Sequence, residues 1–150
     1  MEDGAEAPAP PDTAALLARG WRPLGAQDYI ELVGQVYSRD EEGGTRFGFF
    51  AEPRHRNRRS VIHGGVIAAF ADRALASAGR LANNGLAQAT IELSVRFIDA
   101  VQIGDFVEAK PEVVRKTRSV IFVRSTLNVG ARIVATADGI WKVLGQRPPA

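Results

Sequence analysis

One long helical candidate, from Val61 to Leu81, constrains the fold of this chain more than any other segment. Between Gly64 and Gly79 its residues are small or apolar on almost every side, and only Asp72 and Arg73 carry charge. A surface helix shows one apolar stripe, whereas a helix that is apolar all round is buried. Because the many alanines keep this helix thin, we expect a sheet to curl closely around it.

The segments on either side of this helix show the alternation of β-strands. Ile91, Leu93, Val95 and Phe97 are apolar with polar residues between them, which predicts a strand with these four side chains in the core. The expected strands are Ile30–Tyr37 and Thr45–Phe50 before the helix, and Thr90–Phe97, Phe106–Arg115, Ser119–Val129 and Arg132–Val143 after it. Their short connections require antiparallel pairing. We therefore predict an α+β fold, with one long central helix wrapped by a curved antiparallel sheet of about five to six strands.

The two ends of the chain differ in composition from the central helix and strands. Residues 1–12 are rich in Ala, Pro and Asp and predict a flexible tail, and residues 146–150 predict a second one. Asp12 or Thr13 is expected to cap a short helix over Ala14–Arg19, followed by a turn over Trp21–Gly25. With 150 residues the chain has the size of one domain, which we place at residues 13–145.

Composition excludes several classes of function. The chain has no cysteine and only two histidines, so a disulfide framework, a thiolate metal site and a cysteine nucleophile are excluded, and we expect no metal or cofactor. The net charge of +2 argues against nucleic acid as the main partner. An acidic N-terminus and the lack of a long apolar run predict no secretory signal, no membrane span and a cytoplasmic location.

The start of the long helix and its central acid suggest chemistry. Gly64 and Gly65 allow close approach to the backbone, and a helix N-terminus offers unpaired N–H groups suited to a developing oxyanion. Asp72 lies eight residues beyond Gly64, or about 12 Å at roughly 1.5 Å per residue. One chain therefore cannot place both groups on the same carbonyl. Two antiparallel helices from two chains could, which predicts a dimer with shared sites.

At this point the sequence resembles the hotdog-fold acyl-CoA thioesterases, in the phenylacetate-pathway (PaaI-like) branch. The resemblance runs from about Tyr29 to Leu144. It rests on an ordered set of residues and motifs: Asn57, His63-Gly64-Gly65, Asp72, Thr90–Phe97, Ile103-Gly104-Asp105 and Trp141–Gly145. The fold that it implies is the hotdog fold, in which a curved sheet wraps the central helix.

The resemblance also implies an activity and roles for residues. Asp72 matches the acid that activates water or attacks the thioester, and the Gly64 N–H matches the group that polarises the carbonyl. Asn57 and His63 match polar residues that orient the thioester or water, and Thr90 matches a hydroxyl near the attacking water. The alternation places Thr90 on the face opposite Ile91. The family forms homodimers with shared sites, which often pair into homotetramers.

Basic residues are expected to bind the phosphates of CoA. The candidates, with Gly65 as a further substrate contact, are Arg115, Lys116 and Arg118 on one predicted turn, and Arg58 in the run Arg54–Arg59. The same residues could also form solvated loops, and the basic run could serve another partner. His55, inside this run, is expected to be solvated. Phe47, Phe49, Phe50, Phe70 and Trp141 are expected in the core, where any of them could line an acyl pocket.

Three other functions are alternatives to acyl-CoA hydrolysis. A non-catalytic hotdog module that binds or senses acyl-CoA would tend to lack the helix acid, so Asp72 favours an enzyme. Nucleic-acid binding through Arg54–Arg59 would show a steep salt dependence. A dehydratase of the same fold would carry a helix-facing His in a different motif, which this sequence does not show.

Overall fold

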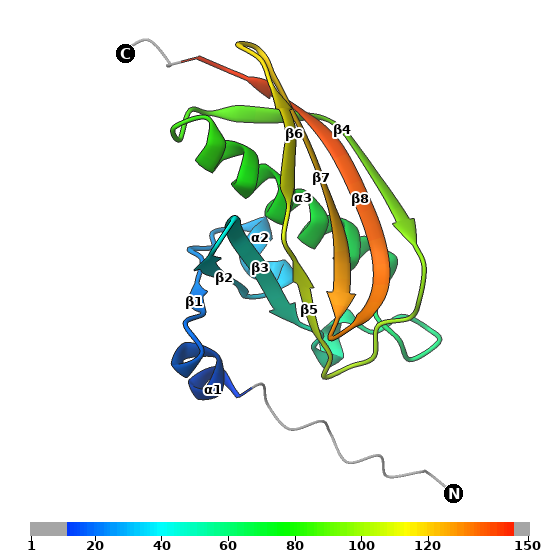
Figure 1. The fold of residues 1–150 in the computed structure, drawn as a ribbon. Helices are drawn as coiled ribbons and strands as arrows, with labels where there is room; N and C mark the ends of the chain where they lie inside the picture. The colour runs from blue at the N-terminus through cyan, green and yellow to red at the C-terminus, as the bar shows by residue number, and fades with distance from the viewer. Residues whose placement is uncertain (1–11, 146–150) are drawn as a thin grey trace, which may run out of the picture.

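A computed structural model describes residues 12–145. The predicted tails, residues 1–12 and 146–150, lie outside the described part except for Asp12, which caps α1. One long helix lies against a curved, eight-stranded antiparallel sheet with the order β1-β2-β3-β5-β7-β8-β4, and β6 pairs with β7 (Figure 1). The elements are α1 Thr13–Ala18, β1 Arg22–Pro23, α2 Tyr29–Val33, β2 Val36–Glu41, β3 Gly44–Phe50, the short 3-10 helix Pro53–His55, α3 Gly64–Ala82, β4 Gln88–Phe97, β5 Phe106–Ala109, β6 Glu112–Lys116, β7 Val120–Val129 and β8 Arg132–Val143.

The predicted central helix is α3. It begins at Gly64 because Ile62 still forms an extended bridge with Arg56, and it ends where Asn83 caps it ahead of Gly85 at φ 79°. Its buried face, formed by Ile67, Phe70, Ala71, Ala74, Leu75 and Gly79, packs on the inner face of the sheet. No helix within residues 12–145 is long and apolar enough to cross a membrane.

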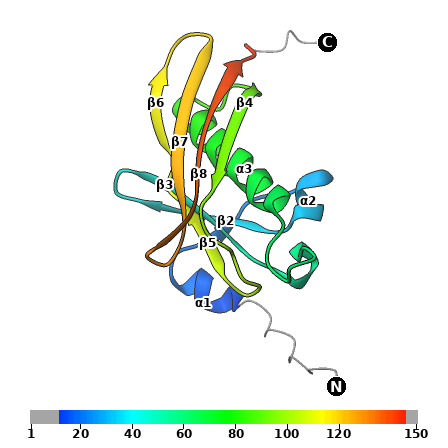
Figure 2. The same cartoon turned by 90° about the vertical axis from the view of Figure 1, so that its right-hand side faces the viewer.

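The composition of α3 predicted a helix that is buried on all sides, and this prediction is wrong. Figure 2 shows β7 and β8 on one side of α3 and α2 on the other. Ala68, Ala69 and Ala76 are only half-buried, and Gly65 is exposed. The physical reason is that the sheet of one chain covers one side of the helix.

The sheet has more strands than predicted. The segment expected to turn at Trp21–Gly25 contains the two-residue strand β1, which pairs with β2. The single strand expected over Phe106–Arg115 is divided at the buried Pro111 into β5, which pairs with β3, and β6, which pairs with β7. Proline cannot donate to a strand ladder, so the division falls at this residue.

The strand predicted over Ile30–Tyr37 is wrong in its first half. Tyr29–Val33 form the short helix α2, and β2 begins only at Val36. Gly34, at φ 126°, separates the two elements in a conformation that other residues rarely adopt. The predicted N-terminal helix is confirmed as α1, with Asp12 accepting a hydrogen bond from the Ala15 N–H at 2.9 Å.

An irregularity in the edge strand β4 changes which side chains face α3. Thr90 pairs with Trp141 and Glu92 pairs with Ile140, so Ile91 is the extra residue of a β-bulge. Leu93 and Val95 pack on the core as predicted, but Ile91 and Phe97 are 57% and 59% exposed. The prediction that Ile91 and Phe97 belong to the core is therefore wrong. The bulge turns Ile91 away from the core, whereas Phe97 keeps the alternation of Leu93 and Val95 but lies at the end of the strand, over Gly64 at the start of α3.

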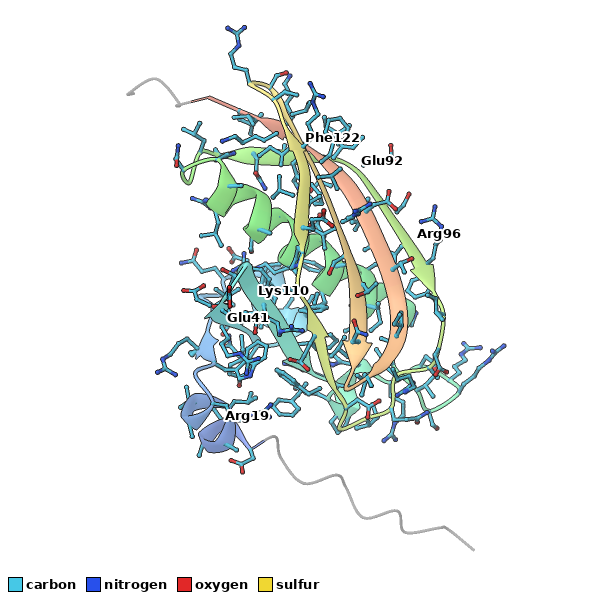
Figure 3. All side chains as sticks on the ribbon, viewed as in Figure 1. Arg19, Glu41, Glu92, Arg96, Lys110 and Phe122 are labelled. Carbon is cyan, nitrogen blue, oxygen red and sulfur yellow. The ribbon has the colours of Figure 1, made fainter. Side chains whose placement is uncertain are left out.

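The tip of the β2–β3 hairpin is held by ion pairs. Glu41 accepts from Arg39, Arg46 and Lys110, and the last of these lies just beyond β5 (Figure 3). The hydrogen bonds from Arg46 and Lys110 lower the pKa of Glu41 to about 2. This cluster fixes the hairpin against the sheet, and the hairpin residues Asp40 and Thr45 line the groove around Asp72 described below.

Candidate active site

The loop before α3 positions the first group of predicted site residues. The Asn57 side-chain oxygen accepts from the Arg59 N–H at 2.8 Å and from the Val61 N–H at 3.4 Å, so Asn57 organises its own loop. The exposed His63 caps α3 by accepting the Gly65 N–H on Nδ1 at 2.9 Å. Arg58 is exposed on the same loop and forms no ion pair within residues 12–145. Asn57, His63 and the two glycines therefore lie at one end of α3.

The cap leaves one backbone donor free at the start of α3. The Gly65 N–H is occupied by His63, and the Val66 N–H donates to the His63 carbonyl at 3.0 Å. Among the described residues no acceptor pairs with the Gly64 N–H. A Cβ atom at Gly64 would come within 3.3 Å of the Phe97 ring, and both residues line a shallow groove of about 360 Å³.

The second group of predicted residues meets at the middle of α3. Asp72 is half-buried, and its Oδ1 accepts a hydrogen bond from the Thr90 hydroxyl on β4 at 2.9 Å. Thr90 does point away from Ile91, as predicted, but the bulge makes its side the helix side of the strand. Asp72 lines a larger open groove of about 780 Å³, with Leu24, Ile30 and Phe47 among its apolar lining residues.

The structure does not bring the Gly64 amide and the Asp72 carboxylate together within one chain. The two grooves have no lining residue in common. Gly64 is the first residue of α3, and Asp72 lies more than two turns along the same helix. A single substrate carbonyl cannot contact both groups of the same chain.

The predicted phosphate-binding residues also divide between the two ends of α3. Arg115, Lys116 and Arg118 are exposed at the β6–β7 hairpin, where the Lys116 ammonium donates to the Ala82 carbonyl at 2.9 Å. Lys116 thus contacts the C-terminal turn of α3, where a cation interacts favourably with the helix dipole. Arg58 lies at the opposite end, beside the N-terminus of the helix.

His55 is a correction, because the prediction placed it in solvent. It is 4% exposed, and its ring forms an edge contact with Phe49. Its Nδ1 accepts the Glu52 N–H at 3.0 Å, so Nε2 carries the proton and donates to the Val33 carbonyl at the end of α2. Burial lowers the pKa of His55 below 6.5. Backbone hydrogen bonds within the loop orient the His55 side chain inward. The arginines next to it in the sequence did not predict this orientation.

Two residues of the grooves were missed by the sequence reasoning. Phe97, expected in the core, instead lies over Gly64 at the edge of the sheet. Arg73 lines the Asp72 groove and donates from Nη2 to the Gly25 carbonyl at 2.7 Å. The sequence could have indicated Arg73, since Arg73 and Asp72 are the two charged residues between Gly64 and Gly79.

Comparison with known proteins decides the family. Residues 60–135, which include α3 and most of the C-terminal strands, match the family model of the thioesterase superfamily. The chain belongs to the thioesterase superfamily. A candidate esterase of Pseudomonas aeruginosa is 25% identical over 125 residues, covering 81% of this chain and 93% of that protein.

Solved structures related to the superfamily share the fold. A Bacillus halodurans protein crystallised with CoA is 24% identical, with a TM-score of 0.63, covering 73% of this chain and 74% of that one. A mutant of the phenylacetic acid degradation protein PaaI from Thermus thermophilus is 20% identical, with a TM-score of 0.60, covering 87% of this chain and 99% of that one. The predicted hotdog fold and thioesterase resemblance are confirmed, with eight strands instead of about five to six.

Proposed function

We propose that this protein hydrolyses acyl-CoA thioesters to a free acid and CoA. The observation that carries the proposal is the half-buried Asp72 carboxylate, held by the Thr90 hydroxyl at 2.9 Å in the larger groove. Asp72 would activate water or attack the thioester carbon directly. The Gly64 N–H, free of any acceptor in the described residues, would donate to the carbonyl oxygen as negative charge develops on it.

The proposed site is shared between two chains of a homodimer. Because Gly64 and Asp72 of one chain lie in separate grooves, an antiparallel neighbour must supply the missing group. The edge strand β4 supports this arrangement, since it carries Thr90 at one end and Phe97 at the other and is paired only with β8. Ile91, Phe97 and Ile98 expose apolar surface along this edge, of the kind that marks a protein interface. Two such dimers would form the homotetramer expected from the family.

The positions of the basic residues support CoA as the leaving group. Within one chain Arg58 and the Arg115–Arg118 hairpin lie at opposite ends of α3. In an antiparallel pair of helices, the Arg58 loop of one chain would approach the hairpin of the other. CoA phosphates would then be bound by residues of both chains. The Bacillus halodurans relative crystallised with CoA supports this choice of ligand.

The chemistry requires little beyond these groups. A thiolate leaves readily, so the reaction needs a polarised carbonyl and an activated water or nucleophile. An oxyanion donor typically contributes about 10²–10³ in rate and general base catalysis about 10²–10⁴. Asn57, His63 and Gly65 would help to position the thioester at the start of α3, as the resemblance implies.

Release of free thiol from a panel of acyl-CoAs tests the proposal. The native protein should turn over at least one acyl-CoA, and Asp72→Asn should lose about 10²-fold or more in kcat while keeping its circular dichroism spectrum and elution volume. Asp138→Asn, which removes a surface carboxylate paired with Arg96, serves as the matched control and should keep its activity. Tight acyl-CoA binding without turnover would instead favour the non-catalytic sensor.

A further inference from the structure

The groove around Asp72 contains several polar side chains, and most of them already have partners in the protein. The Ser77 hydroxyl donates to the Arg73 carbonyl at 2.7 Å, and the Gln88 amide donates to the Ala76 carbonyl at 2.7 Å. Asp40 accepts from the Thr45 hydroxyl at 2.7 Å. The Ser77 hydroxyl proton is therefore already used, and Asp40 is an acceptor that would not bind an anion.

Arg73 differs from these residues. Its Nη2 donates to the Gly25 carbonyl, but its Nε is buried and has no acceptor among the described residues. No carboxylate within residues 12–145 forms an ion pair with its guanidinium, although Asp72 is its neighbour in the chain. A buried donor without an acceptor is unfavourable, and a partly buried cation without a counter-ion more so. Arg73 therefore gives this groove a cation without a counter-ion in the described residues, and such a group suits an anion.

The position of Arg73 indicates which part of a substrate would fill this site. Arg73 follows Asp72 directly on α3, and both residues line the same groove. A group bound there lies close to the reacting carbonyl, whereas the phosphates of CoA are far from the thioester. The anion must then belong to the acyl group. The Nη1 of Arg73 forms no hydrogen bond within the described residues and, unlike Nε, is not enclosed by protein, so its charge-assisted N–H groups would bind a carboxylate in the groove.

We propose that the Asp72 groove selects short acyl groups that end in a carboxylate, and that Arg73 binds this carboxylate. The inference rests on the proposed thioesterase activity and names its substrate class. Arg73 also neutralises the negative charge that the acyl group would otherwise present to Asp72. Leu24 and Ile30 line the same groove and would contact the methylene carbons of the acyl chain.

The test compares acyl-CoAs of similar length that differ in terminal charge. Glutaryl-CoA and hexanoyl-CoA form one such pair, and succinyl-CoA and pentanoyl-CoA another. The native protein should favour the carboxylate member by about 10-fold or more in kcat/KM. Arg73→Gln should remove about 10–100-fold of kcat/KM for glutaryl-CoA, mainly through KM, and change hexanoyl-CoA turnover by less than about 3-fold. Arg73→Lys, which keeps the charge but loses the planar guanidinium, should lie between them.

The control is Arg124→Gln, since Arg124 is an exposed arginine paired with Glu112 outside the groove. It should leave the preference unchanged. Equal kcat/KM for both members of a pair, or an equal loss for both in Arg73→Gln, would overturn the inference and leave Arg73 as an anchor for the loop at Gly25. If no acyl-CoA is hydrolysed, the proposed function fails. Calorimetric binding of glutaryl-CoA and hexanoyl-CoA to native protein and Arg73→Gln then still decides the selectivity.

Discussion

The Thr90 hydroxyl donates a 2.9 Å hydrogen bond to the Asp72 carboxylate, joining the edge strand β4 to the middle of α3. The bulge at Ile91 makes this contact, because it lets Thr90 face the helix together with Leu93 and Val95. The bond occupies one carboxylate oxygen and orients the other. It also connects the strand that would form a dimer interface to the candidate catalytic acid.

Removing the Thr90 hydroxyl should slow catalysis without unfolding the protein. Thr90→Val keeps the shape of the side chain, and we expect kcat to fall by about 10-fold because Asp72 loses the hydrogen bond that orients it. Thr90→Ser retains a hydroxyl and should recover most of the rate. Steady-state thiol release, with thermal unfolding as a check on folding, measures both. Equal rates for the Val and Ser variants would contradict a positioning role for Thr90.

Removing the Gly64 N–H should affect catalysis far more than adding a side chain there. Gly64→Pro deletes the donor at the first helical position, where proline is well tolerated. His63 has φ −65° and ψ 134°, a backbone conformation that suits a residue before proline. Gly64→Ala adds a Cβ atom 3.3 Å from the exposed Phe97 ring, which can move aside, and keeps the N–H. We expect kcat to fall by about 10²-fold in Gly64→Pro and by much less in Gly64→Ala.

Mixing two inactive chains should restore activity if the site is shared. In a heterodimer of Asp72→Asn and Gly64→Pro chains, one site lacks both groups and the other has both. Such a heterodimer should have half of the native activity. A randomly reassembled equimolar mixture, in which half the dimers are heterodimers, should reach about a quarter. Activity that stays at the level of the separate variants, with exchange of chains verified by mass spectrometry, would refute the shared site.

His55 should make the stability of the fold depend on pH near neutrality. Its pKa is lower in the folded chain than the usual 6.5, because burial of the ring outweighs the opposite effect of its hydrogen bond to the Val33 carbonyl. The unfolded chain therefore binds more protons below pH 6.5. The stabilisation from neutral His55 is present above about pH 6.5 and is lost as the pH falls through the lowered pKa.

The measurement is urea unfolding at several pH values between 5 and 8 for native protein and His55→Gln. Glutamine does not titrate, so the free energy of unfolding of the variant should decrease less toward pH 5 than that of the native protein. At pH 8 the variant should be less stable by about 1–3 kcal/mol, because the bonds to Glu52 and Val33 are weakened or lost. Parallel pH profiles for the two proteins would assign the pH dependence to other groups.

Particular elements show which parts of the structure can be predicted from the local sequence. The small and apolar run of α3, the Asp12 cap of α1 and the hairpin from β2 to β3 all follow from short-range patterns, and the structure confirms them. The position of α2 does not follow from such a pattern, since Val33 is held by His55, twenty-two residues away. The division of the strand at Pro111 was readable from the sequence, because proline cannot join a strand ladder.

Local sequence specifies the long central helix, the single acid at its middle, the glycine pair at its start and the antiparallel pairing of the strands, but not the order of the strands in the sheet. Helix periodicity, capping and strand alternation depend on neighbours within a few residues, so the local sequence is enough to predict them. Tertiary contacts bring Thr90 to Asp72, bury His55 and leave Arg73 without a counter-ion within residues 12–145. Those outcomes depend on the register between β4 and β8 and on loops packed against distant segments. A one-residue bulge is enough to move the side chains of a strand to its opposite face.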